Sequence, residues 1–88
     1  MPVTRVDEQV DNLIKALAQT PNLQQVGERM SNNIVIKHLA SGFEAVITIT
    51  PTRYITRAAR PHRYTGSFST PWKALEDFVG FCEQHNRQ

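Results

Sequence analysis

The feature that most constrains the fold of this chain is a strict alternation of side-chain character over residues 43–50. Apolar residues occupy one set of positions and mostly polar residues the other: Phe43, Ala45, Ile47 and Ile49 against Glu44, Val46, Thr48 and Thr50. Successive side chains of a strand point to opposite faces of a sheet, so this pattern indicates a strand with one buried face. A β-branched run, Ile34-Val35-Ile36, precedes it, and Ser41-Gly42 lies between the two as a turn signal. We predict a hairpin with strands at 33–40 and 43–50.

Two amphipathic segments flank this region. In residues 5–19 and 71–85 the apolar side chains recur at helical spacing: Val6, Val10, Leu13, Ile14 and Leu17 in the first, and Trp72, Leu75, Phe78, Val79 and Cys82 in the second. Thr4 precedes the first segment, and Thr70-Pro71 opens the second with a capping residue and a proline suited to a first helical turn. The sequence therefore predicts helices at both ends of the chain.

Two other segments leave alternatives open. Residues 21–31 allow a short helix that begins at Pro21, although Gly27 weakens it. Residues 53–60 fit either a strand or a helix, and the cluster of Tyr, Ile and Thr favours the strand slightly. Residues 63–68 are a candidate for a further edge strand.

These elements together predict an α+β fold. We expect an antiparallel sheet of three to four strands, with the N- and C-terminal amphipathic helices packed on one face. The 88 residues are too few for a second domain of ordinary size, so we expect residues 1–88 to form a single domain.

Composition excludes several classes of protein. Uninterrupted apolar stretches such as Ile34-Val35-Ile36 are far too short to span a bilayer, and the N-terminus lacks the apolar segment of a signal peptide. Cys82 is the single cysteine, so no internal disulfide forms, which favours a reducing compartment. We expect a cytoplasmic protein with no membrane partner.

Residues that could carry catalysis are sparse. Cys82 lies on the apolar stripe of the last predicted helix, where it should pack as a small hydrophobic residue. Cys82 and His85 share a helical spacing, but two ligands do not make a metal site. The four glycines are isolated from one another, so no phosphate-binding loop is present. We expect neither an enzyme nor a cofactor or metal.

The most informative region for function is basic. No acidic residue occurs between Glu44 and Glu76, and four of the arginines fall in this window with two tyrosines and a histidine. Arginine binds phosphate or carboxylate with a planar fork, and tyrosine stacks on bases or fills protein interfaces. We therefore predict a surface that binds nucleic acid or an acidic protein, and the sequence does not separate these partners. Its residues are Arg53, Tyr54, Arg57, Arg60, His62, Arg63 and Tyr64.

The leading hypothesis is therefore a small non-catalytic binding or accessory protein that uses this surface. Two other hypotheses compete with it. The first is a homodimer that pairs an edge strand near residues 53–59 or 63–68 across a two-fold axis. The second is a winged helix-turn-helix regulator, in which Leu23–Ser31 and Asn33–Leu39 form the two helices and the following hairpin forms the wing. A solvated surface without a partner is the plainest explanation of the arginines.

Overall fold

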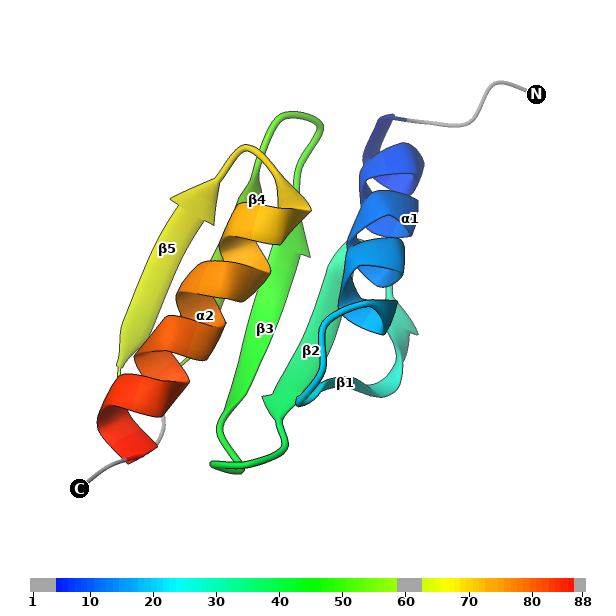
Figure 1. The fold of residues 1–88 in the computed structure, drawn as a ribbon. Helices are drawn as coiled ribbons and strands as arrows, with labels where there is room; N and C mark the ends of the chain where they lie inside the picture. Colours follow the sequence, from blue (N-terminus) through cyan, green and yellow to red (C-terminus); the bar gives the residue numbers. More distant parts are fainter. Residues whose placement is uncertain (1–4, 59–62, 87–88) are drawn as a thin grey trace.

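The computed structural model describes residues 5–58 and 63–86, and it has the α+β architecture (Figure 1). Helix α1 (Arg5–Ala18) comes first and helix α2 (Pro71–Asn86) last. Between them lie the strands β1 (Leu23–Met30), β2 (Asn33–His38), β3 (Glu44–Ile49), β4 (Tyr54–Ala58) and β5 (Tyr64–Phe68). Each strand pairs antiparallel with its neighbour in the sequence, so the sheet order is β1-β2-β3-β4-β5.

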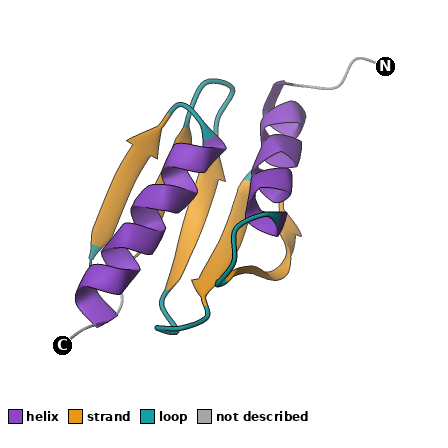
Figure 2. Cartoon of the chain, viewed as in Figure 1, coloured by secondary structure: helices purple, strands orange, loops and turns teal. Residues whose placement is uncertain are grey.

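Both helices cover the same face of the sheet, as Figure 2 shows. Helix α1 contacts β1 and β3, and α2 contacts β4, β5 and α1. The core lies between these two layers, where alternate residues of β2 and β3 meet the apolar stripes of the helices. The fully buried side chains there include Leu13, Ile34, Ile36, Ile47 and Phe78. The opposite face of the sheet, which we call the open face, has no helix over it among the described residues.

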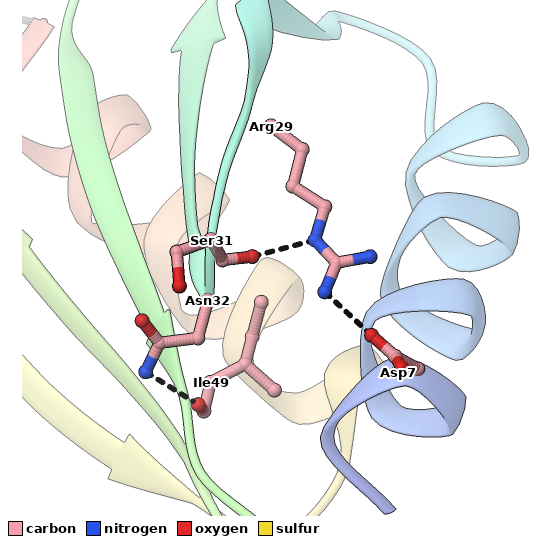
Figure 3. A network of polar contacts seen from close by, with 5 residues as sticks. All are labelled: Asp7, Arg29, Ser31, Asn32 and Ile49. Carbon is pink, nitrogen blue, oxygen red and sulfur yellow. Dashed lines mark hydrogen bonds and ion pairs between the residues drawn. The ribbon is translucent and has the colours of Figure 1, made fainter. Parts of the chain in front are cut away.

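Polar contacts connect the hairpin formed by β1 and β2 to α1 (Figure 3). The Arg29 guanidinium lies 2.7 Å from the Asp7 carboxylate, and its Nε donates to the main-chain oxygen of Ser31 at 2.6 Å. The Asn32 amide donates to the main-chain oxygen of Ile49 at 3.1 Å, which ties the same turn to β3. These contacts hold the β1–β2 turn against both layers of the fold.

The predicted helices at both ends, the hairpin and the strand at 63–68 are confirmed. The strand alternative for residues 53–60 is also confirmed, because β4 covers Tyr54–Ala58.

The expected number of strands is wrong, because the sheet has five rather than three to four. The additional strand is β1, which occupies the segment considered as a short helix. A helix of that length with an internal glycine has little stability of its own. Pairing with β2 instead gives the main-chain N–H and C=O groups hydrogen-bond partners and buries Leu23. The helix-turn-helix hypothesis is also wrong, because both segments that it assigned to helices are strands in the structure.

Candidate interaction surface

An apolar row crosses the open face. The register places Val26 opposite Val35, Val35 opposite Val46, and Val46 opposite Arg57. Val26 is 37% exposed and Val46 is 39% exposed, so these side chains are in contact with solvent on the open face of the sheet. We call Val26, Val35 and Val46 the valine stripe. It runs over β1, β2 and β3 and ends at the exposed guanidinium of Arg57 on β4.

A second row of the open face runs beside the valine stripe. Met30 lies opposite Asn33 and is 67% exposed, and Asn33 pairs with Thr48, whose hydroxyl donates to its amide oxygen at 2.8 Å. Thr48 in turn pairs with Ile55, which is half-buried. Met30 and Ile55 therefore extend the apolar area of the valine stripe on the same face.

The described arginines of the basic window gather along one side of this face. Arg57 projects from β4, in register with Thr65 of β5. Arg53 precedes β4, and its Nε donates to the Ser67 hydroxyl at 2.6 Å. Arg63 is exposed and directly precedes Tyr64, whose ring points to α2, so the alternation of side chains places Arg63 on the open face. We call Arg53, Arg57 and Arg63 the arginine rim.

The arginine rim is not neutralised within the described part of the chain. Arg57 and Arg63 make no hydrogen bond or ion pair with residues 5–58 or 63–86, and Arg53 bonds to Ser67 rather than to a carboxylate. The ion pair found in those ranges is Arg29–Asp7, on the helix side of β1. All three guanidinium groups therefore keep their charge on one face, and those of Arg57 and Arg63 also keep their hydrogen-bond donors available.

Both tyrosines of the predicted surface lie elsewhere, which corrects that part of the prediction. Tyr54 is fully buried beneath α1, where its hydroxyl lies 2.7 Å from the main-chain oxygen of Gln9. Tyr64 points to the helices, donates its hydroxyl proton to the Asp77 carboxylate, and packs against Phe81 with ring centroids 4.5 Å apart. Burial raises the pKa of Tyr54, and burial together with Asp77 raises the pKa of Tyr64. The remaining predicted residues, Arg60 and His62, lie outside the described residues.

The valine stripe was missed by the sequence interpretation, although its signal was present. Val46 stands among the polar positions of the 43–50 alternation, and Val35 faces away from its buried neighbours Ile34 and Ile36. Two adjacent predicted strands each carry an apolar residue at a position expected to face solvent, and this coincidence could have revealed the valine stripe.

Outside this face, Cys82 and His85, the residues considered for catalysis or metal binding, pack against other parts of the fold. Cys82 is fully buried in the core, which confirms its packing role, and burial raises the pKa of its thiol to about 11. His85 packs against the ring of Phe81. Residues 5–58 and 63–86 contain no group of three or more His, Cys, Asp or Glu side chains placed to hold a metal ion. Neither α1 nor α2, the helices in those ranges, has the length and apolar character needed to cross a membrane.

No protein family model, curated protein or solved structure matches this chain. The open face is therefore the part of the molecule that indicates a function. An exposed apolar stripe bordered by arginines without a carboxylate partner among the described residues can bury a partner's apolar side chains and bind its carboxylates or phosphates with forked hydrogen bonds.

Proposed function

We propose that this chain is a small non-catalytic binding protein whose open face contacts an acidic surface of another protein. The observation that carries this proposal is the position of Arg57, which is exposed, has no partner among the described residues, and continues the register row of the valine stripe. One row of the sheet thus joins an apolar strip to a cation.

An apolar centre with a polar border is the usual anatomy of a protein–protein interface, and arginine and methionine are enriched there. The valine stripe with Met30 supplies the apolar centre, and the arginine rim supplies part of the border. The planar guanidinium fork pairs with a carboxylate through two parallel hydrogen bonds, so the rim favours a partner rich in Asp and Glu.

A nucleic acid is the weaker candidate for the same face. Proteins that bind single strands combine cations with aromatic rings on which bases stack. Both tyrosines of the basic window turn toward the helices, and no aromatic side chain of β1–β5 as described points to the open face. Branched aliphatic side chains offer burial but no stacking surface.

The proposal is tested with the wild-type chain and two matched variants, each of which reverses one exposed cation. Arg57→Glu changes the open face, and Lys15→Glu changes α1 on the opposite side of the molecule. Each of the three chains is used to capture proteins from a nuclease-treated extract. Proteins that bind wild type and Lys15→Glu but not Arg57→Glu are purified, and their dissociation constants for the three chains are measured by titration. We expect acidic partners, at least a tenfold weaker dissociation constant for Arg57→Glu, and an unchanged constant for Lys15→Glu.

Labelled single- and double-stranded oligonucleotides at two salt concentrations provide the competing outcome. Tight oligonucleotide binding that weakens in Arg57→Glu and falls steeply with salt would replace the protein partner by a nucleic acid. Equal capture by wild type and Arg57→Glu would remove the open face from the function altogether.

A further inference from the structure

The two edges of the sheet differ in how they meet solvent. At the β1 edge the register shifts between Val26 and Met30, Gly27 has a positive φ of 72°, and Glu28 and Arg29 add charges. Bulges and charges of this kind are how proteins protect an exposed edge from pairing. The β5 edge has none of these features, because its pairing with β4 is continuous and Tyr64–Phe68 contains no charged residue and no proline.

The sequence of β5 is a near-palindrome of side-chain types. From Tyr64 to Phe68 it reads aromatic, hydroxyl, glycine, hydroxyl, aromatic. A strand of this kind pairs antiparallel with a copy of itself so that each position meets its own type. We propose that β5 pairs with β5 of a second copy of this chain, across a two-fold axis at Gly66, to form one continuous sheet with five strands from each copy.

This register gives favourable pairs on both faces of the joined sheet. Tyr64 lies opposite Phe68 of the second copy, and Thr65 lies opposite Ser67. Aromatic pairs and hydroxyl pairs directly opposite each other both stabilise antiparallel strands. Gly66 meets Gly66 at the axis, where the ring of Phe68 already folds over the glycine, 2.5 Å from the position that a Cβ would take. An aromatic ring laid over an edge glycine is a known way of supporting a strand that lacks a side chain.

The helix layer fits the same arrangement. Helix α2 packs on β4 and β5 and leaves a groove of about 580 Å³ between itself and the sheet edge. Because strands lie about 5 Å apart, a helix above the β4–β5 boundary lies about 10 Å from its two-fold copy, which is close to the separation of packed helices. Gly80 lines this groove and adds no side chain to it. Lys73, Glu76 and Asp77 line the same groove, so this side of α2 carries both signs of charge.

Pairing through β5 also joins the two open faces into one. The arginine rims of both copies then border the new strand junction, although the dimer follows from β5 itself and does not depend on the proposed function. Its test needs no partner protein.

The test is a pair of double variants with substitutions at the exposed positions Thr65 and Ser67. The first, Thr65→Glu/Ser67→Glu, places like charges opposite each other in the proposed register, while within one chain the glutamates lie beside Arg57 and Arg53. The second, Thr65→Glu/Ser67→Lys, places a glutamate opposite a lysine in both symmetry-related pairs. Sedimentation equilibrium between about 1 and 200 µM gives the mass of each protein, and circular dichroism confirms that each is folded.

We expect twice the chain mass for wild type, the mass of one chain for the Glu/Glu variant, and recovery of the doubled mass in the Glu/Lys variant. A dissociation constant at least tenfold weaker in Glu/Glu than in Glu/Lys supports the register. A monomeric wild type at 200 µM, a Glu/Glu variant that remains dimeric, or a folded Glu/Lys variant that remains monomeric would each overturn the proposal.

Discussion

The hydroxyl of Tyr54 lies 2.7 Å from the main-chain oxygen of Gln9, so a residue of β4 bonds to α1 across 45 positions of the sequence. The ring of Tyr54 is fully buried between the sheet and the helix, and its polar end meets an acceptor on the helix backbone. A buried phenol without such a partner would lose the hydrogen bond that it makes with water in the unfolded chain. The contact therefore lets an aromatic residue of the basic window join the core.

Replacing Tyr54 by Phe keeps the ring and removes this hydrogen bond. We expect the free energy of unfolding to fall by about 1–1.5 kcal/mol, measured by urea denaturation. The matched control is Tyr64→Phe, which removes the bond to Asp77 on an exposed side of the fold and should cost less. A Tyr54→Phe variant as stable as wild type would show that the Gln9 contact adds nothing to the fold.

The elements with strong local patterns could be predicted from the sequence. Helix α1 ends at Ala18 and α2 begins at Pro71, close to the predicted bounds, because apolar spacing, capping residues and proline all act locally. The hairpin of β2 and β3 follows in the same way from alternation and a glycine in the turn. These signals are contained within a few residues of each element.

Strand β1 and the orientation of the tyrosines depend on partners far along the chain. Leu23 fits the apolar side of either a helix or a strand, and only the pairing of its segment with β2 selects the strand. Tyr54 and Arg53 are adjacent in sequence and lie on opposite faces, so one shared patch could not include both. The arginine rim was predictable as a charge window, whereas its separation from the tyrosines required the register of β4.

The glycines provide a test in which one substitution has opposite effects. Gly42 has a positive φ of 80°, which side chains with a Cβ rarely adopt, so Gly42→Ala should destabilise the fold by about 1–2 kcal/mol. Gly80 lies in α2 with open space at the Cβ position, so Gly80→Ala should stabilise the fold by up to about 1 kcal/mol. Thermal unfolding of both variants at one low concentration checks the signs, and a shift in the same direction for both would contradict the argument.

The Ser41 hydroxyl makes two of the contacts in the turn between β2 and β3. The Ser41 side chain lies 2.7 Å from Nδ1 of the buried His38 and accepts from the main-chain N–H of Phe43 at 3.2 Å. Ser41→Ala removes both contacts, and we expect a loss of about 1–2 kcal/mol in the free energy of unfolding. Ser69→Ala, at an exposed position after β5, is the control and should change stability by less than about 0.5 kcal/mol. Equal effects of the two variants would show that the hydroxyl does not hold the turn.

The buried thiol of Cys82 should lower the free energy of unfolding in alkaline solution. Burial raises the pKa of its thiol from about 9 to about 11, so the folded chain keeps the proton at pH values where the unfolded chain releases it. The contribution of this thiol is therefore constant below pH 9 and is lost as the pH rises toward 11. By linkage the loss is on the order of 2–3 kcal/mol.

Urea unfolding of wild type and Cys82→Ala between pH 7 and 11 measures this contribution, because the tyrosines titrate in both proteins and cancel in the difference. We expect Cys82→Ala to be less stable at pH 7, since it leaves a small cavity among Cys82's buried neighbours. The gap should then narrow above pH 9, where wild type alone must keep a thiol protonated. Stability curves that stay parallel up to pH 11 would show that the thiolate is accommodated in the folded core, and rapid reaction of the native thiol with a disulfide reagent at pH 8 would lead to the same conclusion.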